Sequence, residues 1–170
     1  NQLYTPSLPV VKIRSFIEYK RYSQEGSDGV IQSIFGCVGE GDKTFFEIGV
    51  EDGFECNTRN LRETFDWKGH IIDGGYEDES INLHKHFITS DNVISIMKKY
   101  DTPIEVDFFS LDIDGNDFYI LREILEEYRP RVICAEYNGS FLPTEDKVMK
   151  YDPSHVWDHT NYYGMTLLAL

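Results

Sequence analysis

The sequence lacks any long hydrophobic run. Although 41% of its 170 residues are hydrophobic, no apolar stretch approaches the roughly 18–20 residues that a membrane-spanning helix requires. No secretory signal is recognisable either. The sequence therefore predicts no association with a membrane. Its aromatic content of 14% also excludes a disordered polyelectrolyte.

Basic residues are scarce. The chain has 16 Lys and Arg against 30 Asp and Glu, which gives a formal net charge of −14. Proteins that bind nucleic acids need Lys and Arg to neutralise phosphates, and no stripe of such residues offsets the acids here. The composition therefore argues against a nucleic acid as substrate or partner.

Cysteine is equally sparse. Cys37, Cys56 and Cys134 are odd in number and show no CxxC spacing, which argues against a disulfide scaffold and against a zinc site. Cys134 lies in an apolar run, where cysteine usually acts as a small hydrophobe. This usage fits a reducing compartment, and we predict a cytoplasmic protein.

Short apolar runs do alternate with helical patterns along the chain. Strands are expected at 44–50, 69–74, 84–89, 106–114 and 131–137, and helices are expected to begin near residues 27, 57, 90 and 117. Strands that alternate with helices are typical of a parallel sheet with helices on both faces. The sequence therefore predicts an α/β fold with a doubly wound, Rossmann-like, mostly parallel sheet in the order 3-2-1-4-5.

A length of 170 residues fits a single domain. We expect a helical lead-in at 1–43 whose first 12 residues are extended, a cofactor-binding core at 44–137, and a substrate-side loop with the start of a helix at 138–170. The loop is long and contains aromatic residues, a combination that favours function over disorder. Because the sheet stops at its fifth strand, we also expect later strands of the fold to be missing.

Acidic residues recur where the expected strands end. These residues are Glu47, Asp73, Asp91, Asp112 with Asp114, and Glu136. The carboxyl ends of parallel strands lie at one edge of the sheet, and ligands bind in the crevice outside that edge. The pattern therefore predicts a functional site there.

The segment 45–53 combines an apolar strand with two glycines, Gly49 and Gly53. Such glycines permit a tight turn between a strand and a helix, which is where a nucleotide-like cofactor sits in open α/β sheets. Glu51 stands where many such loops carry a third glycine. The motif therefore predicts a cofactor loop that departs from the common glycine pattern.

The acids of this loop bear on the identity of the cofactor. Glu47, Glu51 and Asp52 would repel a pyrophosphate, which otherwise binds at such a turn. They suit a ligand that carries an ammonium group. We therefore favour S-adenosylmethionine, which has both a sulfonium and an ammonium group, over a dinucleotide.

Two further acids have possible cofactor roles. The carboxylate of Asp73, at the end of the second strand, can accept both hydroxyls of a ribose, although Asp73-Gly74-Gly75 can also be a simple turn. Asp91 can accept from the exocyclic amine of an adenine, or it can cap the helix that follows.

In order along the chain, these segments resemble the class I S-adenosylmethionine-dependent methyltransferases, and within them the FkbM-like group. The resemblance covers roughly residues 20–170. The matching segments are Glu47–Gly53, Trp67–Gly74, Ser110–Asp117 and Pro130–Asn138, together with Ser23-Gln24 and Asp28-Gly29 near the N-terminus.

The resemblance implies roles for several of these residues. It assigns Glu47, Gly49 and Gly53 to the methionine moiety, Asp73 to the ribose, Asp91 to the adenine side, and Asp112 and Asp114 to the transferred methyl group. An O-methyltransferase also needs a base for the hydroxyl proton of its acceptor. Asp114 is the first candidate for this base and Glu136 the second.

The acids near the fourth strand allow another interpretation. Asp112 and Asp114 lie two residues apart on a strand and share a face, so they can hold Mg²⁺ or Ca²⁺ together with Asn116 or Asp117. A metal-assisted hydrolase is therefore an alternative, although we predict no metal.

The polar loop after the fifth strand supplies candidate acceptor contacts. Asn138, Trp157 and Tyr162 combine amide and aromatic groups that suit a small polar molecule or a glycan, although the aromatics can also be simple packing. Among the histidines, His84 is the one expected near the active edge. The sequence thus favours an O-methyltransferase; a non-catalytic binding module of the same fold remains an alternative, and the oligomeric state is open.

Overall fold

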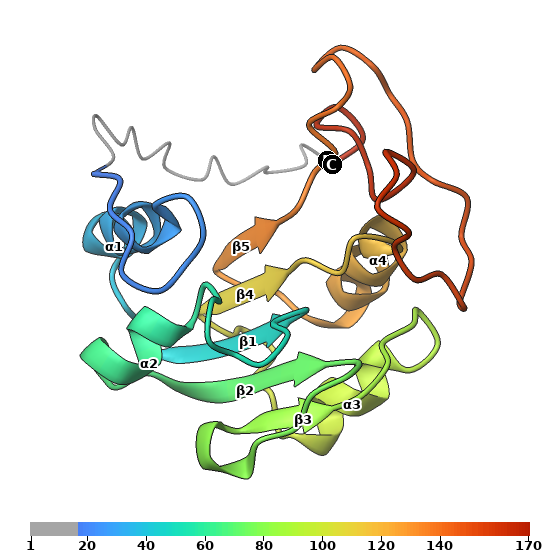
Figure 1. Ribbon diagram of the computed structural model, residues 1–170. Coiled ribbons are helices and arrows are strands. Elements are labelled where there is room, and N and C mark those ends of the chain that lie inside the picture. Colours follow the sequence, from blue (N-terminus) through green and yellow to red (C-terminus); the bar gives the residue numbers. More distant parts are fainter. Residues whose placement is uncertain (1–16) are drawn as a thin grey trace, which may run out of the picture.

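The computed structural model describes residues 17–170, so the extended lead-in expected at residues 1–12 lies outside the described part (Figure 1). The strands are β1 (Thr44–Ile48), β2 (Lys68–Asp73), β3 (Leu83–Lys85), β4 (Phe108–Leu111) and β5 (Val132–Ala135). The helices are α1 (Ser27–Val38), α2 (Arg59–Phe65), the short 3₁₀ helix η1 (Glu79–Ile81), α3 (Val93–Lys99) and α4 (Asp117–Glu127). Strands and helices therefore alternate as the sequence pattern predicts.

The strands form one parallel sheet in the order β3-β2-β1-β4-β5. This order confirms the predicted doubly wound α/β fold. The last residue of β1, Ile48, lies beside Ile72 of β2 and Leu111 of β4. The direction of winding reverses between β1 and β4, and the crevice at the carboxyl ends of these strands is the usual ligand site of such a sheet.

Helices cover both faces of the sheet, α1 and α2 on one face and α3 and α4 on the other (Figure 1). Successive side chains of a strand point to opposite faces. Phe45 accordingly belongs to the same core cluster as Phe35 of α1, whereas Phe46 belongs to the cluster of Met97 in α3. None of these helices has the length and hydrophobicity needed to cross a membrane.

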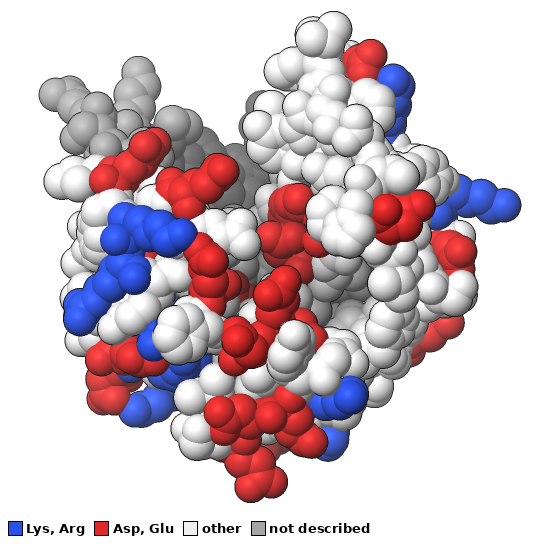
Figure 2. All heavy atoms as spheres, viewed as in Figure 1, with Lys and Arg blue, Asp and Glu red and all other residues white. Residues whose placement is uncertain are grey.

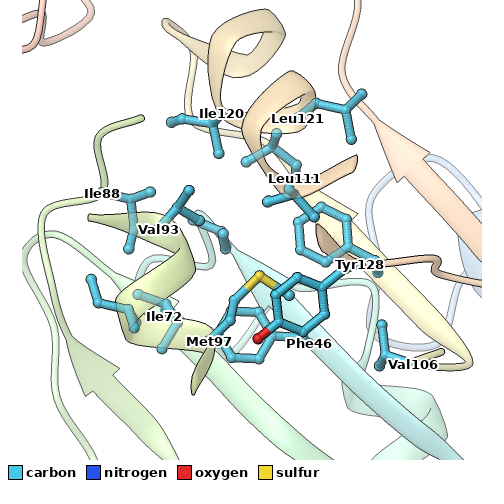
Figure 3. Packing of buried hydrophobic residues seen from close by; sticks show 14 of the residues in the cluster. Phe46, Ile72, Ile88, Val93, Met97, Val106, Leu111, Ile120, Leu121 and Tyr128 are labelled. Atoms are coloured by element: carbon cyan, nitrogen blue, oxygen red, sulfur yellow. The ribbon is translucent and has the colours of Figure 1, made fainter. Parts of the chain in front are cut away.

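The core on the α3 and α4 face is the larger of the two (Figure 3). Met97 of α3 and Tyr128, which follows α4, lie beside Phe46 at the centre of the sheet. Phe46 and Met97 are fully buried. Since strands covered on both faces bury all their side chains, this arrangement explains their continuous apolar runs.

The start of α1 is held by an acidic side chain in its own first turn. Gly26 occupies the N-cap position, and no side chain caps the helix. The carboxylate of Asp28 instead accepts hydrogen bonds from the backbone N–H groups of residues 21–23. These bonds hold the segment before α1 beside the carboxyl edge of the sheet, where Gln24 lines a cavity.

Residues 138–163 form the long loop that the sequence predicts, with no helix or strand in the described structure. The expected helix at Met165 is not formed. Met165 makes a bridge to Val148, and the hydroxyl of Thr166 donates to the carbonyl of Glu145. Because these bonds tie the segment to the preceding loop, a single turn replaces the helix.

Candidate functional site

A cavity of about 550 Å³ opens at the carboxyl ends of β1, β2 and β4. Gly49 contributes from β1, Asp73 from β2, and residues 112–115 from the turn after β4. His155 and Trp157 of the long loop also line it. Segments that are far apart in the sequence therefore meet at the edge where the sequence predicts a site.

The lining of this main cavity is acidic. It includes Glu51, Glu55, Asp73, Asp112 and Asp114, and among the described residues that line it none is Lys or Arg. Figure 2 shows acidic side chains gathered around the hollow at the middle of this face. Such a lining repels phosphate groups and attracts a cationic ligand.

Gly49 lets the turn after β1 approach β4 closely. Its φ is 83°, in the left-handed region that favours glycine. A Cβ at this position would lie 1.6 Å from the carbonyl oxygen of Asp112. The Gly49 N–H also donates to the carbonyl of Ile72 at 2.9 Å. The position therefore requires glycine, and the cavity is bounded here by backbone.

Asp73 holds the same turn from β2. Its Oδ2 accepts from the N–H of Glu51 at 2.8 Å, and its Oδ1 accepts from the N–H of Gly75 at 2.6 Å. Glu51 has a φ of 49°, so it adopts a backbone conformation that usually favours glycine. Since each carboxylate oxygen has two lone pairs, Oδ2 retains one for the hydroxyl of a ligand.

Glu47 is buried beneath a neighbouring cavity, and its carboxylate is already engaged. It accepts from the backbone N–H groups of Asn57 and Thr58, each at 2.9 Å, and from the Thr58 hydroxyl at 2.6 Å. Burial raises the pKa of Glu47, while these hydrogen bonds act in the opposite direction. Its main role in the structure is therefore to hold the start of α2.

This neighbouring cavity has a volume of about 320 Å³ and extends toward the end of β5. Gln24, Gly49, Glu55 and Asp112 line both cavities, whereas Glu136 lines only the smaller one. Asp112 therefore stands between two adjoining spaces, one over β1, β2 and β4 and the other over β1, β4 and β5.

Asp112, Asp114 and Glu136 come together at this junction, with one carboxylate oxygen from each within 4.8 Å of the others. Burial, with the nearby charges of Asp114 and Asp117, raises the pKa of Asp112 to about 6. Burial, with the charge of Asp112, raises the pKa of Glu136 to about 9. At pH 7 Glu136 therefore keeps its proton and shares a hydrogen bond with ionised Asp112.

The spacing of the three carboxyl groups also fits a hard divalent cation, which prefers oxygen ligands. A ligating carboxylate must be ionised, however, so a cation has to displace the proton of Glu136. The metal-assisted hydrolase that the sequence allows remains a hypothesis for this reason.

The turn after β4 is positioned by its own polar side chains. Buried Asp117 accepts from the N–H groups of Ile113 at 3.0 Å and Gly115 at 2.9 Å. Asn116 donates to the carbonyl of Asp152 at 2.7 Å and accepts from the N–H of that residue at 3.2 Å. These bonds fix the turn that carries Asp114 and join the long loop to it.

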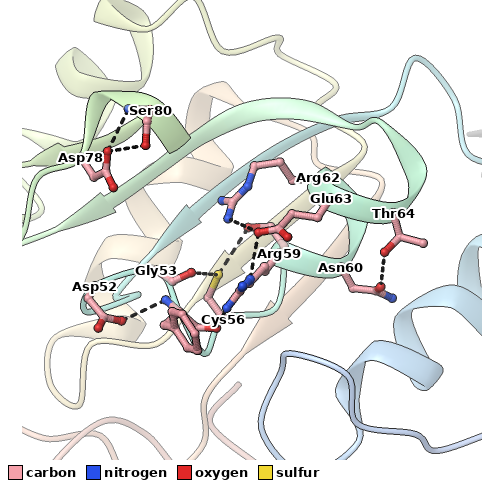
Figure 4. A network of polar contacts seen from close by, with 12 residues as sticks. Asp52, Gly53, Cys56, Arg59, Asn60, Arg62, Glu63, Thr64, Asp78 and Ser80 are labelled. Atoms are coloured by element: carbon pink, nitrogen blue, oxygen red, sulfur yellow. Dashed lines mark hydrogen bonds and ion pairs between the residues drawn. The ribbon is translucent and has the colours of Figure 1, made fainter.

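Several expected cofactor residues lie outside both cavities. Asp52 is exposed and accepts from the N–H of Phe54 at 2.9 Å within the same turn (Figure 4). Gly53 faces Ile81 of η1. Asp91 is exposed and borders neither cavity, and the N-cap of α3 is Asn92. Asp52 and Gly53 therefore make hydrogen bonds within their own turn.

The residues expected to contact the acceptor lie at two different cavities. Trp157 lines the main cavity, whereas Asn138 and Tyr162 line a separate cavity of about 210 Å³. The Asn138 amide donates to the carbonyls of Asn161 and Tyr163, each at 3.0 Å. It therefore braces the long loop instead of facing the main cavity.

Other lining residues were not expected from the sequence. Gln24 lies in one of the segments that carry the resemblance but had no assigned role, and Glu55, Phe87 and His155 belong to segments without a recognised motif. His84, the histidine expected near the active edge, lines neither cavity. The lining histidines are His86 and His155, the latter in contact with the Asp114 carbonyl at 3.2 Å.

The raised pKa of Glu136 predicts a pH-dependent stability. Between about pH 4.5 and 9 the unfolded chain loses this proton while the folded chain keeps it, so stability falls as the pH rises. Glu136→Gln removes this effect and keeps an N–H donor for Asp112. At pH 8 we expect the variant to be more stable by on the order of 2 kcal/mol.

The measurement is urea unfolding with EDTA from pH 5 to pH 9. The matched control is Asp146→Asn, at an exposed carboxyl group in the long loop. A gain for Glu136→Gln that does not grow with pH would contradict the assignment of the proton to Glu136.

Comparisons of the chain with protein-family models, with curated proteins and with solved structures found no match.

Proposed function

We propose that the chain is an S-adenosylmethionine-dependent methyltransferase that acts on a hydroxyl group of a small polar or glycan acceptor. The observation that carries the proposal is the acidic lining of the main cavity at the ligand-binding edge of a doubly wound sheet. A nucleoside ligand with a positive charge fits this lining, whereas a nucleotide with phosphates does not.

The residues of the cavity fit the parts of this cofactor. Asp73, with a lone pair to spare, would accept one ribose hydroxyl. Phe87 and Ile88 offer an apolar surface next to Asp73 for the base. Glu51 and Glu55, which also line the cavity, would neutralise the ammonium group.

When bound, S-adenosylmethionine supplies a methyl group on a positively charged sulfur. The chain must then place the acceptor hydroxyl in line with that group and remove its proton. We assign the removal of this proton to Asp112. Its pKa of about 6 lies near neutral pH, and its side chain lies between the two cavities. Asp114 is the second candidate, since it lines the main cavity only.

Glu136 takes a different role in this proposal from the one that the sequence favours. Its proton at pH 7 makes it a hydrogen-bond donor to Asp112 instead of a base. The smaller cavity, which Glu136 lines, is then the place for the acceptor. Trp157 offers an aromatic face on the other side of Asp112.

Calorimetric titration tests the cofactor. We expect S-adenosylmethionine and S-adenosylhomocysteine to bind, and NAD⁺ and ATP to show no binding because of their phosphates. Binding of the phosphate-bearing nucleotides in place of the other two would overturn the proposal. Cofactor binding without methyl transfer to any member of a broad acceptor panel would indicate a non-catalytic binding module.

Asp73→Ala should weaken the binding of S-adenosylhomocysteine by at least about tenfold, because a hydrogen bond from a ribose hydroxyl to a carboxylate is lost. Asp91→Ala is the matched control, since Asp91 is exposed and lies outside the cavity. The affinity of this variant for S-adenosylhomocysteine should not change. Unchanged affinity in the Asp73 variant would remove this residue from the ribose. Weaker binding of S-adenosylhomocysteine by the Asp91 variant would indicate that Asp91 contacts the adenine side of the cofactor.

The compartment is part of the proposal. Cys37, Cys56 and Cys134 are all free in the described structure. Burial raises the pKa of Cys56 to about 12 and that of Cys134 to about 11, so both thiols are unreactive. We infer a reducing compartment such as the cytoplasm, which matches this use of cysteine.

A further inference from the structure

A cluster of rings lies at the β3 side of the sheet, apart from the carboxylate junction. It contains His70 of β2, His84 of β3, His86, and Tyr100 at the end of α3. The rings of His84 and Tyr100 are stacked, with centroids 4.0 Å apart and an interplanar angle of 14°. His70 also stacks on Tyr100 at 5.0 Å. The tyrosine therefore packs against both imidazoles.

The two stacked imidazoles point nitrogen atoms at each other. His70 Nδ1 lies 2.9 Å from His84 Nε2, so one nitrogen carries a proton and the other accepts it. A metal ion that replaces this proton would be bound by both nitrogens. At the usual metal–nitrogen distance of about 2.0–2.1 Å, two ligands at a right angle are about 2.9 Å apart.

That right angle is typical of tetragonal or octahedral coordination, which Cu²⁺ and Ni²⁺ prefer, and imidazole is a suitable ligand for both ions. We propose that His70 and His84 form a binding site for a divalent transition-metal ion, Cu²⁺ or Ni²⁺, with water as the remaining ligands. The ion lies beside the line that joins the two nitrogens, and each ring turns about its terminal torsion to face it.

The surroundings of His70 and His84 favour neutral imidazoles, the form of histidine that binds a metal ion. Partial burial lowers the pKa of both His70 and His84, so both rings are neutral at pH 7. The negative charge of Asp101 acts on His70, and that of Glu77 acts on His84. These two carboxylates favour a cation at the pair, while the nearby positive charge of Lys99 opposes one at His84.

His86 is excluded from the site by its own contacts. Its Nε2 lies 2.8 Å from the Tyr100 hydroxyl and 3.4 Å from Lys99 Nζ. The lysine ammonium also lies over the Tyr100 ring, 4.9 Å from its centroid. Its positive charge therefore opposes a cation most directly at His86, which it contacts.

The test is a titration of the tag-free, full chain with Ni²⁺, followed by NMR of the imidazole groups. Paramagnetic Ni²⁺ should broaden the signals of His70 and His84 first, and those of His155 and His159 only at higher concentrations. This readout uses the unmodified protein, so it does not depend on whether a variant folds. Broadening that begins at another histidine, or at all of them together, would overturn the proposal.

Variants provide a second, independent measurement by calorimetry. We expect His70→Gln and His84→Gln each to weaken Ni²⁺ binding at least tenfold, whereas His86→Gln and His159→Gln leave it unchanged. Asp112→Asn removes a carboxylate of the junction and should also leave it unchanged. Loss of Ni²⁺ binding in the Asp112 variant, or none in the two histidine variants, would place the metal elsewhere.

Discussion

Replacing Gly49 with alanine is expected to leave the chain at or near complete unfolding. The new Cβ would lie 1.6 Å from the Asp112 carbonyl oxygen, which is backbone and cannot rotate away. The β1 and β4 ends would have to separate, which breaks the bond from the Asp112 N–H to the Ile48 carbonyl. We expect a loss above about 4 kcal/mol, against a total stability of about 5–15 kcal/mol for a small domain.

Gly39→Ala is the matched control for this prediction. Gly39 has a φ of 80°, close to the 83° of Gly49, but a Cβ there has no atom within 4 Å. The control variant therefore carries the conformational cost alone, about 1–3 kcal/mol. Urea unfolding followed by circular dichroism measures both variants. Equal losses would show that the close approach to β4 does not determine the need for glycine at residue 49.

The fold could be predicted because its signals are local. The central strands β1 and β4 are buried on both faces and form short apolar runs in the sequence, each followed by a helical pattern. The right-handed crossover rule then leaves few strand orders to choose from. The residues at strand ends, such as Gly49, Asp73 and Asp112, lie at the cavities for the same reason.

The loop residues could not be predicted in this way. Asp52 stands in the acidic motif, but its side chain bonds to the backbone two residues further on, as aspartate commonly does in turns. Conversely, His155 reaches the cavity because Asn116 ties the long loop to the turn after β4. No spacing in the sequence records that long-range contact.

Which of the acids serves as the base also depends on the distances between the carboxyl groups, which the sequence does not give. In the sequence analysis Asp114 is the first candidate for the base and Glu136 the second. Only the contact of Asp112 with Glu136 shows which of the grouped carboxyls keeps a proton at pH 7. Glu51 is a similar case. Its left-handed backbone conformation shows that the loop keeps the shape of a glycine turn although no glycine is present at this position.

Asp28→Ala is expected to be the second most damaging substitution. Its Oδ2 accepts from the N–H groups of Arg21 and Tyr22 at 2.7 Å and of Ser23 at 2.9 Å, and the side chain of Ser23 accepts from the Asp28 N–H at 2.8 Å. Asp28 and Ser23 are both buried. Since alanine leaves these donors without an acceptor, we expect a loss of about 2–4 kcal/mol in the free energy of unfolding.

The same substitution should also affect the site, because the segment held by Asp28 carries Gln24 to both cavities. Asp28→Asn separates the two effects, since its amide oxygen keeps the acceptor, and we expect a loss of only about 1 kcal/mol. Asp52→Ala is the matched control: it removes an exposed carboxylate that also accepts a backbone N–H, and it should cost less than about 1 kcal/mol.

Urea unfolding gives the stabilities, and titration with S-adenosylhomocysteine below the unfolding transition gives the affinities. If Asp28→Ala unfolds at the same urea concentration as the Asp52 variant, the buried carboxylate does not organise this segment, and the position of Gln24 must depend on other contacts.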